Sequence, residues 1–177
     1  MKNQNTQQKN NRPRINLIKL SLALLIGVFI LSINFHVALA SPIESNILIN
    51  LTNKSRIDNG ADPLKTNVKL TIAAQNKANN MLENDYFEHY SPYGISPWSF
   101  INSSGYDYVM AGENLAMDFA TSEGVHNAWM ASESHRDNIL RADYEEIGIA
   151  TVKGEFDGRE TTMIVQMFGK QMKSTGL

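Results

Sequence analysis

The chain contains no cysteine among its 177 residues. A disulfide framework, thiolate zinc ligands and a cysteine nucleophile are therefore excluded. The sequence also lacks a Walker loop, a dinucleotide-binding glycine pattern and a G-x-S-x-G elbow. It therefore gives no sign of a nucleotide-dependent enzyme or of a serine hydrolase. If the protein is exported, its hydrophobic core alone must hold the fold.

Basic residues are scarce outside the first forty positions. Those positions hold five of the 16 lysines and arginines and no acid, and the other 11 basic residues are outnumbered by 18 acidic ones. The net charge of −7 in that larger part excludes a broad basic face, so nucleic acid is not an expected partner. The chain length allows one hydrophobic core rather than two.

The first forty residues have the pattern of a targeting segment. A basic stretch ends at Lys19, an almost wholly apolar run follows from Leu20 to Ile33, and Ala38-Leu39-Ala40 comes next. This order predicts a secretory signal peptide over residues 1–40. The run is shorter than the roughly 20 residues that cross a membrane. The alternative is an uncleaved signal anchor, which would be the only part of the chain in the membrane. Both alternatives place residues 41–177 outside the membrane, either secreted or anchored at its outer face.

The remaining residues, 41–177, have the pattern of a single α+β domain. Apolar spacing predicts helices over residues 43–59 and 70–82, with a third helix over 123–131 that Thr121 or Ser122 caps. A proline-containing loop over 86–98 precedes a short helix, and a strand is expected over 106–111. Two β-branched runs, 147–152 and 162–168, flank Asp157-Gly158 and predict an antiparallel hairpin. Helices followed by a terminal hairpin indicate the α+β class.

Three residues in different segments have side chains suited to chemistry. His89 lies in the proline-containing loop, Glu113 in a small-residue stretch between an expected strand and helix, and His135 just after a helix. Two imidazoles and a carboxylate match the donors of a catalytic zinc site, with an open position for water. The spacing does not follow an H-E-x-x-H pattern. Local pairing of each side chain therefore remains the alternative.

The segments around these residues resemble those of the CAP superfamily, which comprises cysteine-rich secretory proteins, antigen 5 and pathogenesis-related proteins. The cysteine-free bacterial branch, also called SCP-like, is the nearer match. The resembling pieces occur in the family's order and cover about residues 45–169. They are residues 51–56, 62–64, the alanine-rich helix, His89 with Ser91-Pro92, 111–116, Trp129 with Ser132, 135–140, 146–149 and 166–169.

The resemblance implies a three-layer α-β-α sandwich with a central antiparallel sheet. It also implies a cleft lined by two histidines and two acids, in which His89, Glu113 and His135 take three of the four places. The fourth place departs from the family, because Ser132 stands where other members have glutamate. Glu133 is adjacent, but a shift of one residue turns a side chain by about 100° around a helix. By position, Ser132 is the better candidate.

Two functions fit these expectations. The first is a secreted or cell-envelope binding module whose cleft holds a divalent metal, a small ligand or a peptide, with the partner unknown. The second is a metal-dependent hydrolase, in which His89 and His135 bind zinc and Glu113 is the catalytic group that orients or deprotonates water. A structural role at the cell envelope is a third possibility. The sequence leaves open whether the protein is an enzyme.

Four other residues have a structural interpretation. His126 is expected to be a surface or half-buried helix residue, because no partner follows from its spacing. Trp98 and Trp129 are expected to anchor the core. Arg136 is expected to tie a loop to carbonyl or carboxylate groups.

Overall fold

The computed structural model describes residues 43–172, which belong to one compact unit, Ala40–Leu177. The described part contains five helices and four strands. The helices are α2 (Ser45–Asp58), α3 (Val68–Glu83), α4 (Pro97–Ser103), α5 (Ser122–Ala131) and α6 (Glu133–Leu140). The strands are β1 (Lys65–Thr66), β2 (Tyr108–Met117), β3 (Glu146–Phe156) and β4 (Arg159–Gln171). The predicted signal peptide or anchor, residues 1–40, lies outside the described residues.

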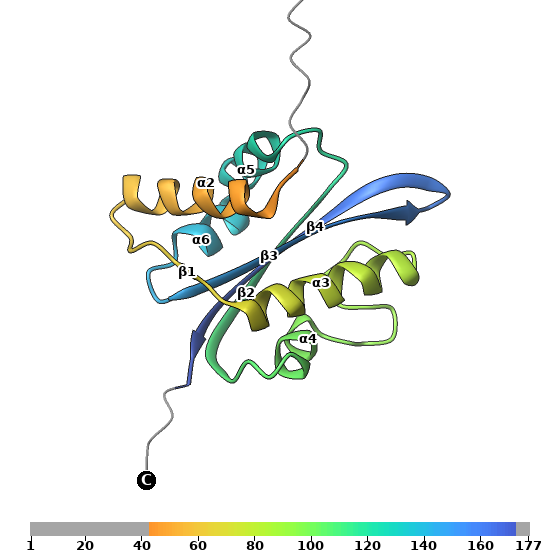
Figure 1. Ribbon diagram of the computed structural model, residues 1–177, viewed down its shortest axis with the longest axis horizontal. Helices are drawn as coiled ribbons and strands as arrows, with labels where there is room; N and C mark the ends of the chain where they lie inside the picture. Colours follow the sequence, from red (N-terminus) through yellow and green to blue (C-terminus); the bar gives the residue numbers. More distant parts are fainter. Residues whose placement is uncertain (1–42, 173–177) are drawn as a thin grey trace, which may run out of the picture. The chain divides into compact units, whose positions relative to one another are not determined.

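The four strands form one sheet in the order β1-β3-β4-β2 (Figure 1). Strands β3 and β4 form the expected antiparallel hairpin. Asp157 and Gly158, both at positive φ, make its turn, as two-residue hairpin turns require. Strand β2 pairs antiparallel with β4, and the two-residue edge strand β1 pairs parallel with β3. The sheet is therefore antiparallel except at this edge.

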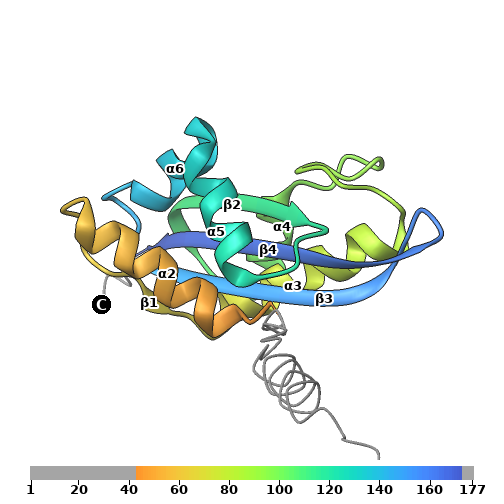
Figure 2. The same ribbon diagram turned by 90° about the horizontal axis from the view of Figure 1, so that it is seen from above.

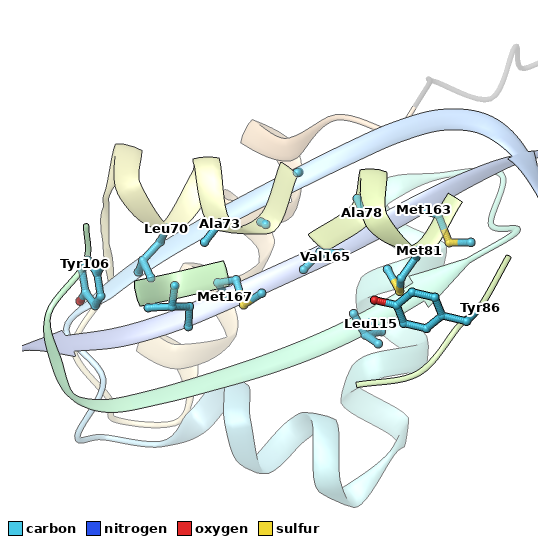
Figure 3. Packing of buried hydrophobic residues seen from close by; sticks show 13 residues of the cluster. Leu70, Ala73, Ala78, Met81, Tyr86, Tyr106, Leu115, Met163, Val165 and Met167 are labelled. Carbon is cyan, nitrogen blue, oxygen red and sulfur yellow. The ribbon is translucent and has the colours of Figure 1, made fainter. Parts of the chain in front are cut away.

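Helices cover both faces of the sheet and give the three-layer sandwich. Helices α3 and α4 lie on one side, and α2, α5 and α6 lie on the other (Figures 1 and 2). Alternation along β4 explains the two cores. Met163, Val165 and Met167 pack with α3 (Figure 3). Ile164 and Phe168 belong to the core beneath the opposite helices. The predicted α+β sandwich is confirmed.

Gly148 on β3 lets the backbone of α3 lie directly on the sheet. A Cβ atom at this position would be 2.2 Å from the Thr71 nitrogen and 2.3 Å from the Leu70 carbonyl carbon. No side chain fits between these backbones. The alanine-rich face of α3, with Ala73, Ala74 and Ala78 fully buried, permits the same close approach.

Strand β2 is longer than the sequence indicates, and this changes the place of Glu113. The expected strand ends at residue 111, but Ala111 to Met117 all pair with β4, with Glu113 opposite Met167. Glu113 therefore lies within a strand and not between a strand and a helix. Pairing with β4 outweighs the weak strand propensity of this stretch, because β-propensity depends on tertiary context.

The expectation for His126 on α5 is wrong. Its side chain is buried, and Nε2 is hydrogen-bonded to Ser55 Oγ on α2 at 2.8 Å. Spacing within one helix does not reveal a partner on another helix. His126 therefore joins two helices on one face of the sheet and takes no part in the cleft described below.

Arg56 is a buried cation that fixes the chain after α6. Its guanidinium donates hydrogen bonds to the carbonyl oxygens of Asp62, Ile139, Arg141 and Tyr144, at 2.7 to 3.3 Å. The bonds to Ile139 and Arg141 satisfy carbonyls at the C-terminal end of helix α6. Arg56 therefore sets the backbone position of residues that line the cleft.

Candidate ligand-binding cleft

His89 and Glu113 form the centre of the candidate site. His89 Nδ1 donates a hydrogen bond to Glu113 Oε1 over 2.6 Å. The His89 side chain is 53% exposed, whereas the Glu113 side chain is 1% exposed. The loop before α4 thus presents an imidazole to solvent while β2 supports it from below with a buried carboxylate.

Lys77 on α3 holds the loop that carries His89. Its buried ammonium group donates to the carbonyl oxygens of Glu88 at 2.8 Å and His89 at 2.9 Å, and to the Tyr86 hydroxyl at 3.1 Å. The same group lies 5.7 Å from the centre of the Phe100 ring. Three hydrogen bonds satisfy all three ammonium donors, so the loop backbone is fixed next to the imidazole.

The two partners influence each other's protonation. The hydrogen bond to Glu113 raises the pKa of His89 above its ordinary value, because a carboxylate favours the charged imidazole. Burial raises the pKa of Glu113, and the hydrogen bond from His89 and the charge of Lys77 oppose that rise. Within residues 43–172, Glu113 Oε2 is buried without a hydrogen-bond partner, so this carboxylate is hydrogen-bonded there through Oε1 to His89 alone.

Ser132 and His135 form a second pair beside the first. Ser132 Oγ is hydrogen-bonded to His135 Nδ1 at 2.9 Å. Burial lowers the pKa of His135, and the positive charge of His89 lowers it further. Glu133 begins α6 and makes no hydrogen bond or ion pair with any residue between 43 and 172. Of these two neighbours, Ser132 is the one that is hydrogen-bonded to His135.

A network of amide side chains connects the two pairs. Asn138 Nδ2 donates to the Glu113 carbonyl oxygen at 3.1 Å and to Asn114 Oδ1 at 2.9 Å. Asn114 Nδ2 donates to the His135 carbonyl oxygen at 3.1 Å and to Gln166 Oε1 at 3.0 Å. These bonds tie α6 to β2, so Glu113 and His135 keep a fixed relation although 21 residues separate them.

Two cavities meet at His89. The first, named here the Arg141 cavity, has a volume of about 410 Å³ and is lined by His89, Tyr90, Pro97, Trp98, Ala111, Gly112, Glu113, Asn138, Arg141 and Tyr144. The second, the His135 cavity, has about 450 Å³ and is lined by Phe87, Glu88, His89, Tyr90, Leu115 and His135. Both include His89 and Tyr90, and together they form the cleft. Volumes of this size are typical of small-ligand sites.

The cleft is lined or supported by residues that sequence reasoning did not assign to it. Lys77 lies among alanines on a helix face, where a buried lysine is not expected. Asn114 and Asn138 lie in the resembling segments, but an amide does not reveal its partners in a sequence. Arg141 follows α6, and no sequence motif around it indicates a role in the cleft. Arg136, as expected, ties to a carbonyl, that of Met130 at 3.1 Å, and Trp129 is buried as predicted.

The donor atoms do not match a three-ligand zinc site. No group of three histidine, aspartate or glutamate side chains within residues 43–172 is arranged to hold a metal ion. The Glu113 carboxylate is hydrogen-bonded to His89. In both His89 and His135, the Nδ1 atom is hydrogen-bonded to a neighbouring side-chain oxygen. Only the Nε2 atoms of His89 and His135 then remain as possible metal ligands in this cleft, whereas catalytic zinc sites have three protein ligands.

Comparison with known proteins identifies the family. Residues 49–168 match the family described as the cysteine-rich secretory protein family, or CAP. The chain belongs to the CAP family. Among curated proteins, the uncharacterized protein YkwD of Bacillus subtilis is 40% identical over 106 residues, which are 60% of this chain and 41% of that protein. The uncharacterized membrane protein YlbC of the same species is 29% identical over 102 residues, 58% of this chain and 30% of that protein. The chain spans less than half the length of both relatives.

Solved CAP structures share the fold. An extracellular protein with an SCP domain from Bacillus anthracis has a TM-score of 0.62 and 24% identity, over 72% of this chain and 40% of that one. An outer surface protein of Borrelia burgdorferi has a TM-score of 0.63 and 24% identity, over 72% and 92% of the two chains. Within residues 43–172, no helix of the CAP domain is long and apolar enough to span a membrane.

Proposed function

We propose that this CAP domain is a binding module that works outside the cell membrane and holds a small ligand or a peptide segment in its cleft. The observation that carries this proposal is the pair of His89 and Glu113, in which a buried carboxylate supports a half-exposed imidazole at the meeting point of two cavities. Backbone and imidazole are both held in place before any ligand arrives, which reduces the entropy lost on binding.

The geometry favours binding over metal-dependent hydrolysis, which is the alternative. A hydrolase of that type needs three ligands for zinc and a free base beside the bound water. Here the Glu113 side chain is 1% exposed, and its Oε1 atom accepts a hydrogen bond from His89. A carboxylate in this state supports the imidazole and is poorly placed to receive a proton from water.

Export is part of the proposal. The basic stretch, apolar run and Ala38-Leu39-Ala40 sequence of the first forty residues support delivery across the membrane. The solved relatives described as extracellular and outer surface proteins agree with this location. N-terminal sequencing of the protein from culture medium should start at Ser41. An intact Met1 on protein retained in the membrane fraction would instead support an anchor.

The test of the binding function is a screen read at the imidazole NMR signals. Zn²⁺, short peptides, sugars and fatty acids are added in turn, and His126 is the internal reference because it lies outside the cleft. A cleft ligand should shift His89, or both His89 and His135, and leave His126 unchanged. The same mixtures are checked for product with wild-type protein and Glu113→Gln. If the wild type forms product and Glu113→Gln does not, the result contradicts the proposal and favours the hydrolase. If neither His89 nor His135 shifts with any ligand, the proposal is also contradicted.

A further inference from the structure

Arg141 is an exposed residue whose guanidinium lies at one wall of the cleft, and the contact with the Tyr144 ring is the only one that the guanidinium has among residues 43–172. Its carbonyl oxygen accepts a hydrogen bond from buried Arg56 at 2.8 Å, so its backbone is held. Its guanidinium carbon lies 5.8 Å from the centre of the Tyr144 ring. Within residues 43–172 the guanidinium makes no hydrogen bond and no ion pair. Five N–H donors therefore remain available at the edge of the cavity.

The charge around the Arg141 cavity has the opposite sign to most of the domain. Residues 41–177 carry 18 acids against 11 lysines and arginines, yet in the described part of the chain Glu113 is the only acid that lines this cavity. The Glu113 carboxylate is buried, and Oε1 already accepts a hydrogen bond from His89. Arg141 and the half-exposed imidazole of His89 are therefore the cationic groups that an incoming ligand meets, and a cavity with these groups favours an anion.

The rest of the cavity wall is aromatic and apolar. Tyr90, Pro97, Trp98 and Tyr144 line it, and the Trp98 ring is held by a tilted contact with Tyr108 at 6.5 Å between ring centres. Tyr90 is 55% exposed, so it lies at the entrance. Aromatic walls bind apolar groups and other rings. The cavity thus offers an anion site and an apolar site within one space.

We propose that the Arg141 cavity binds a carboxylate that carries an apolar or aromatic group, such as the C-terminal residue of a peptide or a free aromatic acid. The planar guanidinium forms paired hydrogen bonds with the two carboxylate oxygens. Trp98 and Tyr90 cover the apolar group. This inference rests on the proposed binding function and names the chemical class of its ligand. The cavity volume of about 410 Å³ fits a single large residue or a small aromatic acid.

The experiment compares three probes that differ in charge and source. N-acetyl-phenylalanine represents a peptide C-terminus, 3-phenylpropionate represents a free aromatic acid, and N-acetyl-phenylalanine amide has the same ring without the charge. Dissociation constants are measured from the NMR signals of His89 and the Trp98 indole. At least one acid should bind about tenfold or more tightly than the amide, as expected for one charge-assisted pair. The acid that binds more tightly identifies the source.

Two variants assign the effect to Arg141. Arg141→Gln should weaken acid binding about tenfold and leave amide binding unchanged. Arg141→Lys should give an intermediate loss, because it keeps the charge but not the paired geometry. Arg159→Gln is the matched control, since Arg159 is exposed at the start of β4 and lines neither cavity. Melting curves of all variants establish that each one is folded.

The outcomes separate this inference from the proposed function. Equal binding of acid and amide, or equal acid binding by wild type and Arg141→Gln, would overturn the carboxylate site. A response of the cleft imidazoles to other ligand classes but to neither acid would do the same while leaving the binding function intact. If the NMR signals of His89 and His135 do not shift with any class of ligand, both the carboxylate site and the binding function are overturned.

Discussion

Ser132 Oγ lies 2.9 Å from His135 Nδ1. Ser132 has an extended backbone, which ends α5 and begins α6, so its side chain turns toward the imidazole three residues later. A hydroxyl group therefore stands where the resemblance to other CAP proteins places a glutamate. The substitution replaces a carboxylate, which would favour a charged imidazole, with a neutral hydrogen-bond partner.

Replacement of Ser132 by glutamate should raise the pKa of His135. In the wild type burial lowers this pKa, and a carboxylate within hydrogen-bonding distance favours the protonated form. An NMR titration of the His135 ring measures the change. Glu133→Gln is the control and should leave the titration unaltered. A larger response to the change at 133 than to the change at 132 would show that the wrong residue has been assigned to the cleft.

Alanine at Gly148 should destabilise the domain far more than alanine at Gly154, although both lie on β3. A Cβ atom at 148 meets the backbone of α3 at 2.2 Å, whereas one at 154 meets the end of the Leu82 side chain at 2.8 Å. Backbone cannot move aside, and a leucine side chain can. We expect a loss of about 3 kcal/mol or more at 148 and less than about 1 kcal/mol at 154.

Urea unfolding followed by circular dichroism measures both losses of free energy. Similar values for the two variants would contradict the close contact between α3 and the sheet. Because each variant adds the same methyl group to the same strand, the comparison removes the general effect of replacing glycine.

His126 should make the stability depend on pH. Burial lowers its pKa from 6.5, and Nδ1 is buried with no hydrogen-bond partner among the described residues, so the folded state favours the neutral ring. The unfolded chain binds the proton more readily. The contribution of neutral His126 to stability is therefore present above about pH 6.5 and is lost as the pH falls below it.

The wild type should consequently lose more free energy of unfolding than His126→Gln between about pH 7 and about pH 5. The slopes of the two curves are compared, because the substitution itself adds a constant cost. Parallel curves would mean that the buried ring is not kept neutral by the fold.

Periodicity in the sequence predicts most of the fold because those elements are defined by local patterns. The β3–β4 hairpin follows from two β-branched runs around Asp157-Gly158, and α3 follows from its apolar stripe. The end of β2 does not, since its small residues become a strand only through pairing with β4. The resemblance to CAP proteins supplies His89, Glu113 and His135, which spacing alone does not bring together.

What the sequence could not give are contacts made by polar side chains across the fold. Lys77 is recognisable as a support for the His89 loop only when its three acceptors are located. Ser55 is not a visible partner of His126, which lies 71 residues further along the chain. Arg141 becomes notable only because the fold places it at a cavity, where its guanidinium forms no hydrogen bond or ion pair with residues 43–172. Such contacts join residues that are far apart in the sequence, so they produce no periodic pattern from which they could be predicted.

The buried carboxylate of Glu113 holds the imidazole of His89 in the cleft and favours its protonated form. The most direct test is an NMR titration of the His89 ring in wild type and in Glu113→Gln. In the wild type the pKa of His89 should lie above 6.5, because Glu113 accepts its Nδ1–H bond. In the variant the carboxylate is lost, so burial and the charge of Lys77 should bring the pKa of His89 down. Identical titrations in both proteins, with the pKa of His89 at the ordinary value of 6.5, would contradict the account.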